Sequence, residues 1–194
     1  MMTNEDTDAV IAALRIAPGF EAVEAEHCSI ERLGGMTNKV YLVATGGQSV
    51  IVRIPGAGTE AYIDRKVELH NAKAAWRAGV SAEVLWGDPD SGVMISRAID
   101  DIETMSPALF KTRAGSPARA GKALGKLHNS GETFEFRFEL FAMIEDYLKV
   151  LSDKDATLPD GYHDIVAAAD PVKQALEAAP VALAPCHCDP LCEN

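Results

Sequence analysis

The chain has 194 residues, of which 47% are hydrophobic and 24% are charged, a composition typical of proteins that fold around an apolar core. Its 18 Lys and Arg residues against 29 Asp and Glu residues give a formal net charge of −11. Such a field repels a phosphate backbone, so we expect no nucleic-acid partner.

The N-terminal sequence and the apolar runs indicate a cytoplasmic protein. The first ten residues, MMTNEDTDAV, are acidic and lack the charged and then apolar order of a secretory signal. No apolar run reaches the roughly 18 residues that cross a bilayer. We therefore expect no membrane insertion, and the sequence predicts no particular oligomeric state.

The first hundred residues predict a short helix, then a small sheet with one main helix. The helix lies within residues 7–20 and ends at Pro18 and Gly19. A Gly46-Gly47 pair between two apolar runs indicates a hairpin, because both glycines tolerate positive φ. A longer helix is expected to end before Gly79, where a left-handed residue suits the helix end. The expected strands cover residues 28–33, 39–44, 49–54, 83–86 and 93–96, and the main helix covers 60–78.

Helical patterns dominate the second half of the chain. Ser116 before Pro117 predicts a helix whose first turn is capped by the serine hydroxyl. Apolar spacing predicts another helix through residues 141–151 and a weaker one over 165–178. The change in composition near residues 98–102 is typical of a hinge between two lobes.

A glycine pair and a buried arginine are the features of the first half that could bind phosphate. Gly34 and Gly35 would let backbone N–H groups approach an anion, and Thr37 or Asn38 could add side-chain donors. The spacing matches neither a dinucleotide-binding loop nor a Walker A loop. An ordinary β-turn is therefore the alternative interpretation of this loop.

Arg53 lies in the apolar run of residues 49–55, where an unpaired guanidinium would be costly to bury. Glu68 on the following helix is the nearest acidic partner, on a stripe that includes Trp76 and is expected to face the sheet. A strand arginine facing a helix glutamate can hold nucleotide phosphates in register. The alternative is a solvated arginine and a surface glutamate.

The final segment, PCHCDPLCEN, has the H-x-D-x-x-x-x-N spacing of a phosphotransferase loop. In such a loop Asp189 would accept the proton of a substrate hydroxyl, and Asn194 would bind Mg²⁺. The alternative is a metal site made of His187 and three thiols, Cys186, Cys188 and Cys192. The close crowding of these four groups disfavours their surrounding one zinc ion.

In this order the features resemble the choline/ethanolamine kinase family, within the wider group that includes the aminoglycoside phosphotransferases. GGMTNKVYLV is similar to that family's nucleotide loop, and VIVRIPG to its third strand, with arginine in place of the protein-kinase lysine. MISRAID resembles the segment that connects the lobes, ALGKLHNSG the helix ending in Leu-His, and PCHCDPLCEN the catalytic loop. The resemblance extends from about residue 30 to the C-terminus. Cys188 departs from it, because many relatives carry a polar residue such as Asn there.

The resemblance implies a bilobal, protein-kinase-like α+β fold. Residues 1–98 would form an N-lobe of antiparallel sheet plus helix, and residues 99–194 an incomplete, mainly helical C-lobe that ends in the catalytic loop. Asp189 would be the catalytic base and Asn194 the metal ligand. The residues implied in ATP binding are Gly34, Gly35, Thr37, Asn38, Arg53, Glu68, Ser96 and Ala98.

The implied activity is the phosphorylation of a small amino alcohol, choline or ethanolamine, with ATP and Mg²⁺. The alternatives are a kinase for another small hydroxylated cation, such as thiamine or an aminoglycoside, and a non-catalytic nucleotide-binding relative. Kinases of this type carry a second metal-binding Asp after the loop, whereas this sequence stops at Asn194. We therefore expect a fragment, a truncated record or a degenerate relative, and no appreciable phosphate transfer by these 194 residues alone.

Overall fold

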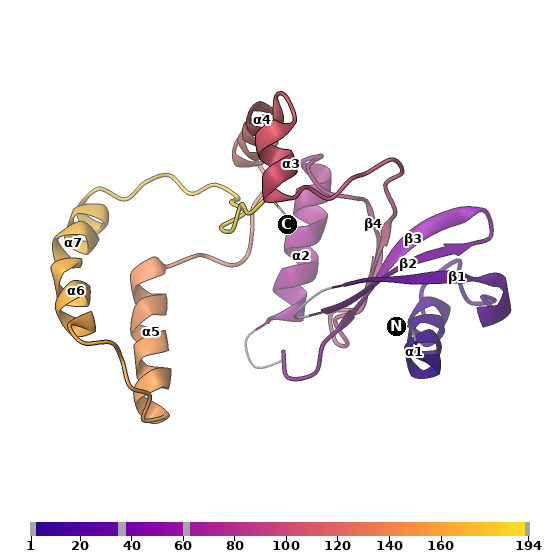
Figure 1. Cartoon of the computed structure of the whole chain (residues 1–194), viewed down its shortest axis with the longest axis horizontal. Helices are drawn as coiled ribbons and strands as arrows, with labels where there is room; N and C mark the ends of the chain where they lie inside the picture. Colours follow the sequence, from indigo (N-terminus) through magenta and orange to yellow (C-terminus); the bar gives the residue numbers. More distant parts are fainter. Residues whose placement is uncertain (1–2, 35–37, 60–62, 193–194) are drawn as a thin grey trace. The chain divides into compact units, whose positions relative to one another are not determined.

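The computed structural model describes residues 3–34, 38–59 and 63–192 (Figure 1). Contacts along the chain divide it into two compact units, one of Met1–Glu135 with Ala184–Asn194 and the other of Phe136–Leu183. The first unit contains the sheet, and the second contains helices only. The lobe boundary between residues 98 and 99 stays a prediction.

The first unit is built on a five-stranded antiparallel sheet in the order β1-β2-β3-β5-β4. The β2–β3 hairpin turns through Gly46 and Gly47, whose φ angles are 57° and 78°. Glycine adopts this conformation without steric strain, so the local sequence explains the turn. The predicted antiparallel sheet is confirmed, with strands β1 (Ser29–Gly34), β2 (Asn38–Thr45), β3 (Gln48–Pro55), β4 (Val84–Gly87) and β5 (Met94–Arg97).

Helix α1 (Asn4–Arg15) packs on one face of this sheet, and the short 3₁₀ helix η1 (Ala25–His27) leads from it to β1. Val52 on β3 lies in the core beneath α1. Because strand side chains alternate between faces, the adjacent Arg53 points to the other face. The core on the α1 side includes Val10, Ile11, Leu14, Tyr41, Val43, Val50, Val52 and Ile95.

A buried carboxylate anchors α1 to the sheet. Asp6 is 4% exposed and accepts hydrogen bonds from the Tyr41 hydroxyl at 2.7 Å, Lys39 Nζ at 3.2 Å and Thr3 Oγ1 at 3.0 Å. These bonds, the one from Tyr41 foremost, hold the pKa of the Asp6 carboxyl well below its usual range. Burial and the neighbouring carboxylate raise the pKa of Tyr41 to about 12. Hydrogen bonds within one network lower the pKa of Asp6, and burial together with that network raises the pKa of Tyr41.

Helix α2 (Arg65–Arg77) begins after Asp64, whose carboxylate accepts from the N–H groups of Lys66 and Val67. It ends just before Gly79, which has a φ of 68° as the sequence predicted. The expectation that Trp76 packs against the sheet is wrong, because its side chain is 39% exposed. The buried stripe of α2 instead contains Ala74, which is 0% exposed.

Helices α3 (Pro107–Thr112) and α4 (Ser116–His128) follow β5. The predicted Ser116 cap of α4 is wrong, because Gly115 with a φ of 76° holds the cap position. Ser116 is the first helical residue instead and accepts a hydrogen bond from Arg119 Nη2 at 3.0 Å. A left-handed glycine turn therefore replaces the side-chain cap.

The second unit contains α5 (Leu140–Asp153), α6 (Tyr162–Ala168) and α7 (Asp170–Ala178). Lys173 on α7 lies 2.7 Å from Glu145 on α5. The single helix expected over residues 165–178 is wrong, because the structure has two helices separated at Ala169. Pro171 lies in the first turn of the second helix, α7. Proline lacks an N–H donor and clashes with the preceding turn, which explains the break. Within the described ranges, no helix is both long and apolar enough to cross a bilayer.

Candidate functional site

The face of the sheet opposite α1 carries several of the predicted site residues. Arg53 lies two positions from Ile51 and Pro55, whose partners on the neighbouring strands are Ser96 and Asn38. Residues two apart, and residues paired across strands, point to the same face. Strand register therefore places Asn38, Arg53 and Ser96 on one face.

The segment after β5 continues along β3. The backbone N–H of Ala98 donates to the Ser49 carbonyl oxygen at 3.1 Å, one residue beyond the last paired residue of β5. Ser96 and Ala98 are two positions apart along this extended segment, so they are on the same face. The two residues predicted in the connecting segment thus lie at the edge of the Arg53 face.

The predicted ion pair between β3 and α2 is confirmed. Arg53 Nη2 lies 3.0 Å from Glu68 Oε2, and the two side chains are only 26% and 21% exposed. Arg65 Nη1 lies 2.9 Å from the same oxygen. Two guanidinium groups therefore share one carboxylate oxygen, and the three side chains carry one net positive charge.

Two hydrogen-bond donors of the Arg53 guanidinium lack aligned acceptors among the described residues. Its Nε and Nη2 atoms are buried, and neither donates a well-aligned hydrogen bond to any residue in the described ranges. The Glu68 oxygen is at ion-pair distance from Nη2 but is not aligned with its N–H bonds. Burial lowers the pKa of Arg53, an effect that Glu68 opposes and Arg65 reinforces. An anion on this face would supply the missing acceptors, since leaving a buried donor unpaired costs about 1–3 kcal/mol.

The glycine loop is described only at its two ends. Gly34 ends β1, and Asn38 begins β2. The pairing register shifts between Arg32 and Gly34, as in the β-bulges that often lie beside functional sites. Gly35 and Thr37 lie outside the described residues, so their roles stay predictions.

The predicted catalytic loop forms a tight turn around Asp189. Its backbone N–H donates to His187 Nδ1 at 3.3 Å, and its carbonyl oxygen accepts from the N–H of Leu191 at 2.8 Å. Cys188 has a φ of 65°, a conformation that non-glycine residues rarely adopt and that Asn tolerates best. Such local strain clusters at functional sites. Asn194 lies outside the described residues.

The thiols of this loop donate hydrogen bonds to backbone oxygens. Cys186 Sγ donates to the Ala184 carbonyl at 3.3 Å, and Cys188 Sγ donates to the Cys186 carbonyl at 3.7 Å. Desolvation of the sulfur, with Cys186 nearby, raises the pKa of the Cys188 thiol. Both observations favour protonated thiols over the thiolates that bind metals.

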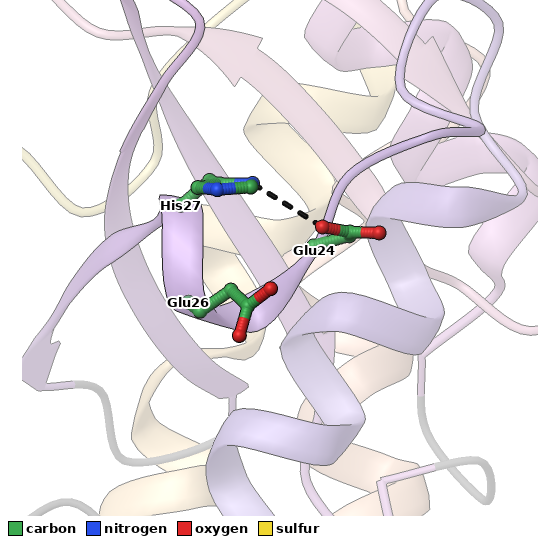
Figure 2. Close-up of side chains that lie close together, drawn as sticks. All are labelled: Glu24, Glu26 and His27. Atoms are coloured by element: carbon green, nitrogen blue, oxygen red, sulfur yellow. Dashed lines mark ion pairs between the residues drawn. The ribbon is translucent and has the colours of Figure 1, made fainter.

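A small cluster of two carboxylates and a histidine lies on η1 and on the residue just before it. Among the residues that the structure describes, Glu24, Glu26 and His27 are the one set of three metal-ligating side chains close enough to share an ion (Figure 2). All three are exposed, and His27 Nδ1 lies 3.3 Å from Glu24 Oε2. Exposed carboxylates are ordinary on protein surfaces, so we assign no metal to this cluster.

Arg65 and Thr59, which belong to the cluster around Glu68, were not predicted from the sequence. Arg65 Nη2 donates to the Thr59 hydroxyl, while its Nη1 holds Glu68. The i,i+3 spacing of Arg65 and Glu68 is a helical pair signal that was available in the sequence. No local pattern indicates Thr59, because its contact depends on how the loop before α2 folds.

A five-stranded antiparallel sheet, a strand arginine paired with the main helix, and helices followed by an H-x-D loop together define a protein-kinase-like α+β fold. The family model described as the phosphotransferase enzyme family (APH) matches residues 29–194. The chain therefore belongs to this family.

Known relatives agree with this assignment. The chain is 30% identical over 160 residues to Protein LicA of Haemophilus influenzae, covering 82% of this chain and 59% of the relative. It is similar to the structure of a choline/ethanolamine kinase family protein from Mesorhizobium loti, with 54% identity and a TM-score of 0.81 over 97% of this chain and 60% of that one.

Two structures of LicA are also similar. The choline kinase LicA from Streptococcus pneumoniae is 28% identical with a TM-score of 0.67, over 86% of this chain and 57% of that chain. LicA in complex with AMP is 28% identical with a TM-score of 0.64, over 86% of this chain and 56% of that chain. The chain thus spans about 60% or less of the length of these relatives.

Proposed function

We propose that the protein containing this chain transfers phosphate from ATP to the hydroxyl group of a small amino alcohol, choline or ethanolamine. The observation that carries the proposal is the buried Arg53 guanidinium, whose Nε and Nη2 lack aligned acceptors within the described ranges. Family membership and the AMP-bound LicA relative support a nucleotide phosphate as the missing acceptor. The choline kinase and choline/ethanolamine kinase relatives support the class of acceptor.

The nucleotide would lie on the face of the sheet that carries Arg53. Arg53 would donate to phosphate oxygens, with Glu68 fixing its position. The backbone and side chains of the glycine loop would add further donors, and the connecting segment would lie beside the base. These contributors are Gly34, Gly35, Thr37 and Asn38 in the loop, and Ser96 and Ala98 in the segment.

Asp189 would act as the general base on the acceptor hydroxyl. The carboxylate lies in an exposed turn, where an incoming alcohol can reach it. General-base catalysis requires hydrogen-bonding distance to the hydroxyl, so the turn around Asp189 must hold its carboxylate at a fixed position. Proton transfer to Asp189 would leave the substrate oxygen as the nucleophile toward the terminal phosphate.

The oxygen donors in the loop suit Mg²⁺. A carboxylate and an amide oxygen are hard ligands of the kind that Mg²⁺ prefers, whereas the neighbouring thiols are soft and hydrogen-bonded to carbonyls. Asn194 would hold the ion with a carboxylate from a longer chain. When bound, Mg²⁺ neutralises charge on the β- and γ-phosphates.

The test is an ATP-dependent turnover assay with choline, ethanolamine, thiamine and an aminoglycoside, run on this chain and on a longer form that contains it. We expect turnover by the longer form with an amino alcohol, and a loss of several orders of magnitude in Asp189→Asn with ATP affinity retained. Asp160→Asn, which changes another exposed aspartate, is the matched control. ATP binding without turnover in the longer form would favour the non-catalytic relative, and absence of both would reject the proposal.

A further inference from the structure

We propose that Arg65 is a positioning residue for phosphate binding, which acts on Arg53 through the Glu68 carboxylate. The inference rests on the proposed nucleotide site and adds a residue that lies in none of the sequence motifs quoted for that site. Its basis is a series of contacts that connects Glu68 to the end of the strand carrying Arg53.

Arg65 is the most buried charged side chain of this cluster, at 8% exposed. One arm of its guanidinium, Nη1, lies 2.9 Å from Glu68 Oε2, and the other, Nη2, donates to the Thr59 hydroxyl. A planar guanidinium that bonds two partners at once is fixed in direction as well as in distance. Arg65 therefore holds the Glu68 carboxylate at a defined place.

Thr59 links this arrangement to the backbone. It is 3% exposed, and its hydroxyl donates to the Gly56 carbonyl oxygen at 2.8 Å. Gly56 directly follows β3, the strand that carries Arg53. The contacts run from the end of β3 through Thr59, Arg65 and Glu68 and return to the same strand at Arg53.

The stem of Arg65 is held by the β4–β5 turn. Gly92 is buried in this turn with a φ of 73°, and a Cβ atom there would lie 2.6 Å from Arg65 Cδ. Only a glycine leaves room for the arginine stem in its present position. Packing therefore restricts the rotamer of Arg65 in addition to its hydrogen bonds.

This arrangement explains why the Arg53 donors remain open. Glu68 could accept from both Nε and Nη2 of Arg53 if its carboxylate turned both oxygens toward the guanidinium, as isolated Arg-carboxylate pairs do. Because Arg65 binds Oε2, the carboxylate is held at ion-pair distance from Arg53 without alignment. Arg65 thus keeps the Arg53 guanidinium available to an anion.

The first test is ATP binding by the 194-residue chain, measured by calorimetry with adenosine as the second ligand. We expect Arg65→Gln to weaken ATP binding roughly three- to tenfold and to leave adenosine binding unchanged. Arg65→Lys should behave like Arg65→Gln, because it keeps the charge but loses the fork. Arg77→Gln removes an arginine at the other end of α2, where it bonds Glu132, and should change neither affinity.

A double-mutant cycle separates positioning from direct contact. In a Glu68→Gln background, Arg65→Gln should change ATP affinity by less than about twofold, because its route of action is already removed. An equal loss in both backgrounds would mean that Arg65 acts on the phosphates directly, and wild-type behaviour of Arg65→Lys would mean that charge alone matters. Either result would overturn the positioning role.

A readout without nucleotide keeps the inference distinct from the proposed function. The Arg53 Nε–H signal in ¹H–¹⁵N spectra, assigned through Arg53→Lys, should shift or broaden in Arg65→Gln and Thr59→Val but not in Arg77→Gln. If neither this chain nor the longer form binds ATP while this signal responds, the proposed function fails and the action of Arg65 on Arg53 stands. An unchanged Arg53 signal in both variants would reject the positioning role even if ATP binds.

Discussion

Two charged clusters lie on opposite faces of the same sheet and differ in how completely they are satisfied. On the α1 face, both oxygens of the Asp6 carboxylate accept hydrogen bonds, from groups that include Tyr41, Lys39 and Thr3. On the other face, Arg53 and Arg65 share one oxygen of Glu68, and the buried Nε of Arg53 meets no acceptor in the described part of the chain. The first cluster is closed, and the second has donors left for a ligand.

Burial of charge serves two different purposes on the two faces of the sheet. A buried polar group that is fully hydrogen-bonded contributes to stability and to a defined position of the elements it joins. A buried donor left unpaired lowers stability, and a protein retains it where a ligand supplies the acceptor. We therefore expect mutations in the two clusters to have opposite profiles in stability and in ligand binding.

The largest expected effect is on the Arg53 face. Arg53→Met should weaken ATP binding about ten- to hundredfold, because hydrogen bonds to a charged partner contribute roughly 1.5–3 kcal/mol. The free energy of unfolding should stay within about 1 kcal/mol of wild type, since the unpaired donors disappear and Glu68 keeps Arg65. Calorimetry and urea unfolding measure the two quantities. Unchanged ATP affinity, or a large loss of stability, would contradict the contrast between the clusters.

The next largest effect is expected on the Asp6 face, where a mutation should change the free energy of unfolding and leave ATP binding unchanged. Tyr41→Phe should lower the free energy of unfolding by about 1.5–3 kcal/mol, because it removes a buried hydrogen bond to a carboxylate. ATP affinity should not change. Tyr147→Phe, at a tyrosine on α5 that is 63% exposed, is the control and should stay within about 0.5 kcal/mol of wild type. Equal stability of the two variants in urea would show that the Asp6 network is not an anchor.

Acid should remove the contribution of Asp6. The pKa of this carboxyl is lowered in the folded protein, so its contribution is fully present above the unfolded value of about 3.9 and is lost as the pH falls below it. The stability difference between wild type and Asp6→Asn should therefore be constant above about pH 5 and should shrink below about pH 4. Urea unfolding across this range measures it, and a difference that persists undiminished to about pH 2 would count against the shift.

The smallest effect concerns the tyrosine hydroxyl. With a folded pKa of about 12 for Tyr41, its contribution to stability is present below the unfolded value of about 10 and is lost as the pH rises toward 12. Alkaline titration by phenolate absorbance should show one of the four tyrosines ionising last. In Asp6→Asn this late step should move down toward pH 10, and an unmoved step would exclude the carboxylate as a cause.

Local signals in the sequence predicted most of the sheet. Gly46 and Gly47 adopt positive φ without steric strain, so the pair between two apolar runs was enough to predict the hairpin. The prediction that Ser116 caps α4 was wrong, because Gly115 makes the turn into the helix. Both residues suit a helix start, and the preceding chain path decides between them.

The two clusters show where sequence reasoning about the site ends. The Arg53–Glu68 pair was predictable, since an arginine in an apolar strand needs an acidic partner nearby. The bond between Asp6 and Tyr41 joins residues 35 positions apart, and Thr59 meets Arg65 only after the loop before α2 has folded. Such contacts depend on the packing of whole elements, which no local spacing encodes.

Whether the buried Arg53 donors bind phosphate is tested most directly by following the Arg53 Nε–H signal of the 194-residue chain during titration with ATP. Adenosine is used in a parallel titration. The unsatisfied donors of Arg53 should take phosphate oxygens as acceptors, so ATP should shift this signal strongly and adenosine should not. The backbone amide of Asp6, in the closed cluster on the other face, should not respond to either ligand. ATP binding with no response at Arg53, or with a larger response at Asp6, would contradict the assignment of the open cluster as the phosphate site.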